Sequence, residues 1–137
     1  MVAPEISLGG NFAYDENGDF YSSTTVYGYV KKKGITDSYK SLLAILNSQV
    51  LWWYLVNTGT VLANGYFRFM PHYIKSFPMP NISKSVGLKL EALVTSILSA
   101  KAMSPNTNTE ELEEDLDKLI YSLYNLTSDE IDEVKRL

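Results

Sequence analysis

The sequence predicts an α+β domain: a small, mostly antiparallel β-sheet packed on a buried central helix, followed by an α-helical hairpin and a short C-terminal helix. Three observations predict this class. Short alternating segments with β-branched and aromatic residues fill residues 5–30. An apolar stretch with helical spacing follows at residues 38–56, and leucine-rich helical patterns occupy the chain after Pro80.

Residues 5–30 are predicted to form short strands. Asn17-Gly18 is predicted to be a tight hairpin turn, because both central positions of such a turn require positive φ. Aromatic residues flank this pair, namely Phe12, Tyr14, Phe20 and Tyr21. A further strand is predicted from Thr24 to Val30, where alternation resumes, and Lys31-Lys32-Lys33 ends it. Lysines at a strand end either protect a sheet edge or contact phosphates, and both interpretations stay open.

One helix is predicted from about Ser38 to Val56, capped by Thr36 or Asp37. One stripe of it is apolar: Tyr39, Leu42, Leu43, Leu46, Val50 and Trp53. The opposite side is apolar as well, at Ala44, Ile45, Leu51, Trp52 and Leu55. A helix that is apolar nearly all round is buried, so this one is predicted to form the centre of the domain and to end at Asn57-Thr58-Gly59.

The segment Gly65–Pro80, GYFRFMPHYIKSFPMP, begins with a strand-like alternation. Phe67 and Phe69 are predicted to share one face of this strand, and Tyr66 and Arg68 the other. A turn through Met70-Pro71 and an extended stretch from Ser76 are predicted to follow. An exposed guanidinium and a tyrosine ring suit base edges and phosphates. The alternative is an aromatic core strand whose arginine pairs with a local carboxylate.

The chain after Pro80 is predicted to be helical. Apolar residues recur at helical spacing in two stretches, Val86, Leu90, Leu93, Ile97 and then Leu112, Leu116, Leu119, Ile120, Leu123. Residues 104–108 form a short linker between them, which predicts an antiparallel hairpin. Thr127 and Glu130 have the spacing of a capping box, which predicts the start of a last helix.

Composition excludes several classes of site. The chain has 137 residues, no cysteine and a single histidine, so disulfides, thiolate metal sites and cysteine nucleophiles are excluded. None of its five prolines are adjacent, and no glycine-rich phosphate loop is present. We therefore predict no catalytic residues and no metal site in this chain. Neither a signal peptide nor a membrane span is evident, and a cytoplasmic location without membrane partners is expected.

Charge is unevenly distributed along the chain. The formal net charge is −4. Residues 1–80 carry six basic and five acidic side chains, whereas residues 81–137 carry six basic and eleven acidic ones. An acidic surface repels phosphate, so a nucleic-acid interface is predicted only within the first eighty residues.

Three phrases of the sequence together resemble a known family. They are Thr24-Thr25-Val26-Tyr27 with the leucine-rich LLAILNS at residues 42–48, then GYFRFMPHYIKSFPMP, and finally DKLIYSLYNLTSDEIDEV at residues 117–134. The chain is similar to the TaqI-like C-terminal specificity domain, the target-recognition domain of adenine-specific DNA methyltransferases and type IIG restriction–modification enzymes. The methyltransferase domain that precedes this region in the family is missing here, which implies a fragment of a larger bacterial enzyme.

The resemblance implies a division of labour. Residues 1–80 would form the α+β domain that recognises the target in double-stranded DNA, and residues 81–137 a helical appendage. S-adenosylmethionine would bind the parent's methyltransferase domain, with Mg²⁺ needed if the parent also cleaves, and this chain would hold no cofactor. The candidate DNA contacts are Lys31, Lys32, Lys33, Asn64, Tyr66, Arg68, His72 and Lys75.

Two other functions remain open from the sequence. One is a module like the specificity subunit of a type I restriction system, in which the helices after Pro80 dock partner subunits. The other is a protein-interaction module that binds no DNA, with the tyrosine-rich sheet holding a peptide.

Overall fold

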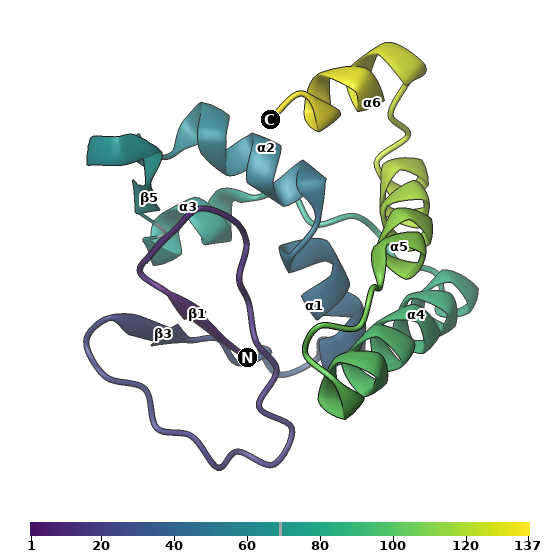
Figure 1. Cartoon of the computed structure of the whole chain (residues 1–137), viewed down its shortest axis with the longest axis horizontal. Helices are drawn as coiled ribbons and strands as arrows, with labels where there is room; N and C mark the ends of the chain where they lie inside the picture. Colours follow the sequence, from purple (N-terminus) through teal and green to yellow (C-terminus); the bar gives the residue numbers. More distant parts are fainter. Residues whose placement is uncertain (69) are drawn as a thin grey trace.

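The computed structural model describes residues 1–68 and 70–137, and its fold is α+β as predicted (Figure 1). The strands are β1 (Val2–Pro4), β2 (Ile6–Ser7), β3 (Val26–Gly28), β4 (Thr60–Val61) and β5 (Phe67–Arg68). The helices are α1 (Tyr39–Leu46), α2 (Gln49–Thr58), α3 (Pro71–Ser76), α4 (Lys84–Met103), α5 (Glu110–Leu123) and α6 (Ser128–Lys135), with a short 3-10 turn, η1, at Ala63–Gly65.

The strands form two small antiparallel sheets rather than the single sheet that was predicted. In the first, β1 pairs with β3, with Ala3 opposite Tyr27. In the second, β5 lies between β2 and β4. Glu5 separates β1 from β2, so one short stretch of chain contributes an edge strand to each sheet.

The prediction of a hairpin at Asn17-Gly18 was wrong. Gly18 has a positive φ of 74°, but no strands flank the turn among the described residues. Instead the Asp15 carboxylate accepts hydrogen bonds from the backbone N–H groups of Gly18, Asp19 and Phe20, at 2.9 to 3.1 Å. A side chain that satisfies three successive backbone donors stabilises a local loop. Those N–H groups are then no longer available for the hydrogen bonds of a β-ladder.

The predicted central helix is two helices with a break at Asn47-Ser48. Ser38, not Thr36 or Asp37, caps α1 by accepting from the Ser41 N–H, and Ser48 caps α2 by accepting from the Leu51 N–H. Asn47 clamps the N-terminal loop at this break: its amide donates to the Phe12 carbonyl at 2.9 Å and its oxygen accepts from the Phe12 N–H at 2.8 Å. The predicted end of the helix is confirmed, since α2 stops at Thr58 before Gly59.

The aromatic segment also departs from expectation after Arg68. Phe69, predicted to share a face with Phe67, lies outside the described residues. The predicted turn at Met70-Pro71 is the start of α3, with Pro71 in the first turn, where a missing N–H costs nothing. Ser76, predicted to be extended, ends this helix, and the extended stretch begins at Phe77.

The helical part after Pro80 has the predicted hairpin and capping box. Helix α4 packs against α5, and both reciprocal bonds between Thr127 and Glu130 are present at the start of α6. Helix α4 also packs on α1, while α5 and α6 pack on α2. The most deeply buried large side chains come from both halves of the chain: Ile45, Leu51, Leu55, Leu90 and Ile120. A division into domains at residue 80 therefore remains a prediction.

Candidate nucleic-acid interface

The β2-β5-β4 sheet has one outward face and one inward face. Directly opposed residues of an antiparallel ladder point to the same side. Arg68 lies opposite both Ile6 and Thr60, and all three are exposed. In the adjacent row Phe67 is buried, and its ring meets Trp52 edge-on with centroids 5.2 Å apart. Burial of Phe67 thus orients Arg68 outward, as the alternation predicted.

Arg68 forms an ion pair with Glu5, the residue between the two sheets. The Arg68 Nε lies 3.1 Å from the Glu5 Oε1, and the Arg68 side chain is 43% exposed. This is the carboxylate pairing that the sequence left open as an alternative. A pair that is this exposed contributes little stability, about 0–1 kcal/mol. The ion pair joins Glu5 to Nε and not to the two terminal nitrogens of the guanidinium.

Asn64 and Gly65 form the tight turn between β4 and β5. Their φ angles are 65° and 76°, and the Leu62 N–H donates to the Tyr66 carbonyl at 2.7 Å. Gly adopts positive φ without a steric cost and Asn does so more readily than other residues, so this pair suits the loop that joins the two strands. Asn64, a candidate base contact, therefore adopts the backbone conformation that the turn needs. Its side chain is exposed, and the contact with a base stays a prediction. Tyr66 follows the turn and is 42% exposed.

His72 and Lys75 belong to α3, the helix that follows β5 in the sequence. Both side chains are exposed, and the His72 ring lies 4.0 Å from the Tyr73 ring, centroid to centroid. The Tyr73 hydroxyl and the Thr60 hydroxyl share a hydrogen bond, which ties α3 to β4. We name the set Asn64, Tyr66, Arg68, His72 and Lys75 the β5–α3 surface. Sequence reasoning missed three residues next to this surface: Glu5, which pairs with Arg68, Thr60, which lies opposite Arg68 in the ladder, and Tyr73, which is hydrogen-bonded to Thr60. These are contacts between separate segments of the sequence, and no local pattern indicates them.

The lysine run, Lys31–Lys33, is not part of the β5–α3 surface. It follows β3, which belongs to the other sheet. The Lys31 ammonium donates to the Asp37 carbonyl at 2.7 Å and lies 4.8 Å from the centroid of the Tyr39 ring. Lys31 is thus engaged at the start of α1, whereas Lys32 and Lys33 are exposed. These two lysines are the members of the run whose ammonium groups can reach a phosphate without breaking a contact in the structure.

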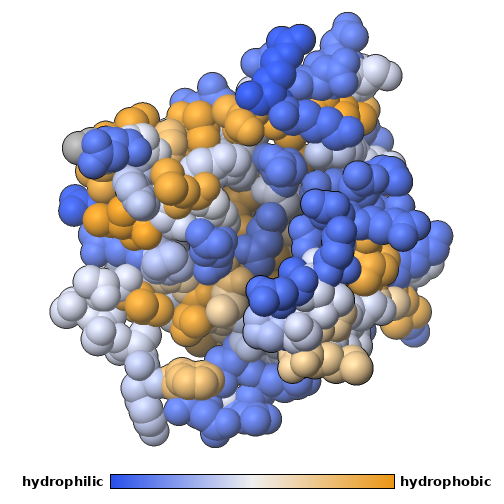
Figure 2. Space-filling model, viewed as in Figure 1, coloured by the Kyte–Doolittle hydropathy of each residue, from blue (hydrophilic) through white to orange (hydrophobic). Residues whose placement is uncertain are grey.

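The acidic helices lie away from this surface in the view of Figure 1. There β5 and α3 are at the left, and α5 and α6 are at the right. Figure 2 shows mostly hydrophilic residues over α5 and α6, and a mixture of apolar and polar residues over the opposite side. Three glutamates, Glu110, Glu111 and Glu113, stand in the first turn of α5. Strand β5, which carries Arg68, therefore lies apart from α5 and α6.

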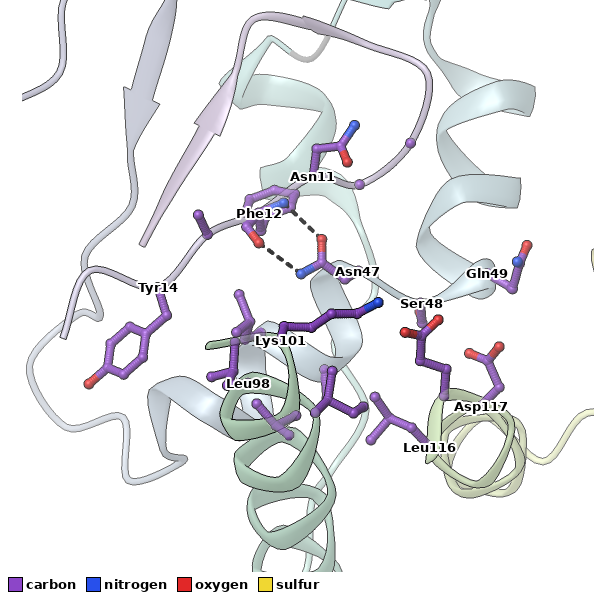
Figure 3. A pocket seen from close by; sticks show the side chains of 18 residues that line it. Asn11, Phe12, Tyr14, Asn47, Ser48, Gln49, Leu98, Lys101, Leu116 and Asp117 are labelled. Carbon is purple, nitrogen blue, oxygen red and sulfur yellow. Dashed lines mark hydrogen bonds between the residues drawn. The ribbon is translucent and has the colours of Figure 1, made fainter. Parts of the chain in front are cut away.

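A cleft of about 810 Å³ lies between the Gly9–Tyr14 loop, α1, α4 and α5 (Figure 3). Its polar groups hold the fold together. Asn47 clamps Phe12, and the Lys101 ammonium donates to the Thr107 carbonyl at 2.8 Å. Burial raises the pKa of the Asp117 carboxyl, and a hydrogen bond from the Gln49 backbone N–H partly offsets this rise. We interpret the cleft as part of the packing interface between residues 1–80 and the helices α4 and α5.

Within residues 1–68 and 70–137, no three His, Cys, Asp or Glu side chains are grouped so that they can hold a metal ion. No helix in the described part of the chain is long and apolar enough to cross a membrane.

Comparison with protein families matches residues 1–79 to the TaqI-like C-terminal specificity domain. This match covers the two sheets, α1, α2 and α3. Neither a curated protein nor a solved structure matches the chain significantly.

Proposed function

The chain belongs to the TaqI-like C-terminal specificity domain family, and from this membership we propose that it is the DNA target-recognition domain of a restriction–modification enzyme that methylates adenine. The family match over residues 1–79 carries the proposal. The chemistry would reside in a separate methyltransferase domain of the same parent, which binds S-adenosylmethionine. A parent that also cleaves DNA would need Mg²⁺ in a further site.

The exposed side chains suggest two kinds of DNA contact. Lys32 and Lys33, with Lys75 of α3, are flexible point charges suited to phosphates, which position the duplex without reading it. Arg68 has a planar fork that suits guanine O6 and N7, and Tyr66 beside it can stack or hydrogen-bond. We propose that the lysines hold the duplex and that the outward face of the β2-β5-β4 sheet reads the bases.

Replacing Lys31, Lys32 and Lys33 together by alanine is expected to weaken binding about equally on every DNA sequence. Each lysine that contacts a phosphate contributes roughly one unit to the slope of log affinity against log salt. Fluorescence anisotropy with labelled duplexes of unrelated sequence measures both quantities. The matched control replaces Lys84, Lys89 and Lys118, three exposed lysines of α4 and α5, and removes the same charge.

The control variant is expected to retain the affinity and the salt slope of the unaltered chain. Equal losses in the two triple variants would show that only net charge matters and would contradict a phosphate contact by the lysine run. Loss on one sequence alone would assign the run to base reading instead.

A further inference from the structure

A small pocket opens between α2, the Phe77-Pro78 segment and α6. Its volume is about 250 Å³. This is below the range of about 300–1,000 Å³ for pockets that enclose drug-sized ligands. The volume therefore suits one large side chain rather than a whole small molecule.

Four of the ten described residues that line the pocket are aromatic. They are Trp53, Tyr54, Phe77 and Tyr124. Tyr54 and Phe77 meet edge to face with centroids 5.2 Å apart, and Phe77 and Tyr124 are tilted at 5.9 Å. The Tyr124 hydroxyl donates to the Pro78 carbonyl at 2.9 Å, which fixes its ring. Such a wall is rigid before anything binds, so little conformational entropy is lost on binding.

The charge at the pocket has one sign. Among the described residues that line it, only Glu130 and Glu133 are charged. Hydrogen bonds from Thr127 hold the pKa of Glu130 below its usual value, so this carboxylate is negative at neutral pH. Figure 2 shows hydrophilic surface over α6 next to apolar surface over α2. Aromatic faces and carboxylates both attract cations, and together they disfavour an anion or a neutral polar group.

We propose that this pocket binds a single arginine or lysine side chain presented by a polypeptide segment. The cation would lie against the aromatic rings with its charge toward Glu133, and its aliphatic stem would fill the apolar part of the pocket. This inference does not rest on DNA recognition, since the pocket shares no residue with the β5–α3 surface or the lysine run.

Arg136 is the local competitor for Glu133. Its Nη1 lies 2.8 Å from the Glu133 Oε2, but the two side chains are 73% and 55% exposed. An ion pair between such exposed neighbours on one helix is weak, so an incoming cation can replace it. Removing Arg136 is therefore expected to strengthen binding of the partner.

The test uses a capped tripeptide, Leu-Arg-Leu, and its neutral counterpart with citrulline in place of arginine. Binding to the full chain is followed by NMR, through the Trp53 indole N–H and the methyl groups of Leu126 and Val134. The arginine peptide is expected to bind at least about threefold more tightly than the citrulline peptide. Trp53→Leu is expected to reduce its affinity by roughly 2- to 30-fold.

Charge variants keep the test informative even if Trp53→Leu fails to fold. Glu133→Gln is expected to weaken binding by roughly 1.5- to 5-fold, and Arg136→Ala to strengthen it. Asp132→Asn, the same change of charge at a neighbouring position that does not line the pocket, should leave the affinity unchanged. Equal affinity for the arginine and citrulline peptides would overturn the proposal. Binding of free methylguanidinium as tight as that of the peptide would overturn a polypeptide partner.

Discussion

Replacing Gly10 by alanine is expected to lower the free energy of unfolding by about 1–3 kcal/mol. A Cβ at this position would lie 2.6 Å from the Leu46 carbonyl oxygen and 3.0 Å from the Asn47 Cα. Both are backbone atoms at the break between α1 and α2, so neither can move aside as a side chain would. Urea unfolding, followed by tryptophan fluorescence, measures the loss.

Gly9→Ala is the matched control for this substitution. The nearest atom to a Cβ at Gly9 is the Asn11 Nδ2 at 3.6 Å, which is ordinary contact. Both substitutions restrict the unfolded chain to the same extent, so they differ only in the contacts of the added Cβ. We expect Gly9→Ala to raise stability by no more than about 1 kcal/mol, because it adds no close contact. Equal stabilities for the two variants would show that the Gly9–Tyr14 loop does not pack against the helix break as closely as the structure has it.

Replacing Arg68 by alanine is expected to relax the DNA preference of the chain at one base pair. A bidentate arginine–guanine contact discriminates by about 1–3 kcal/mol, which is roughly 5- to 150-fold between the preferred and the other bases. Selection from a pool of randomised duplexes, before and after the substitution, measures the preference at each position. The salt slope should change by no more than about one unit, unlike that of the lysine variants.

Glu5→Gln provides the control for the structural alternative. It removes the ion pair of Arg68 and leaves the guanidinium in place. If Arg68 reads a base, Glu5→Gln should retain the preferred base, while Arg68→Ala loses it. If Arg68→Ala weakens every duplex by the same factor, the residue contacts a phosphate. If it changes no affinity at all, the ion pair with Glu5 is its only role.

Two Asn-Gly pairs show what local sequence can and cannot predict. The pair at residues 64–65 forms a hairpin turn, and the pair at residues 17–18 does not. Asn64 and Gly65 both have positive φ, whereas of the second pair only Gly18 does, and only the first pair has strands on both sides that pair. Asp15 captures three backbone donors around the second pair, and that competition is not visible in a turn signal alone.

The central helix shows a similar limit. Its apolar periodicity correctly predicted burial of Leu43, Ile45, Leu51 and Leu55. The break at Asn47-Ser48 was missed because the apolar pattern continues across it. Serine at an N-cap is a local signal that could have indicated the second helix. The partner of Asn47, the backbone of Phe12, lies thirty-five residues away, and no local pattern identifies such a contact.

Local signals were sufficient where the structure depends on neighbouring residues. The capping box of Thr127 and Glu130 and the hairpin of α4 and α5 follow from spacing alone. In the candidate interface, alternation correctly placed Phe67 inward and Arg68 outward. The identity of Glu5 as the partner of Arg68 depends on strand register, which short strands of two residues do not reveal in sequence.

The dependence of double-stranded DNA affinity on salt tests the central claim most directly. For the unaltered chain we expect weak binding at low salt, with a Kd on the order of 10⁻⁵ M. Three phosphate contacts would lower the affinity by roughly 40-fold between about 50 and 200 mM monovalent salt. An affinity that stays constant over this range, or no binding to any duplex at low salt, would contradict a role in holding DNA.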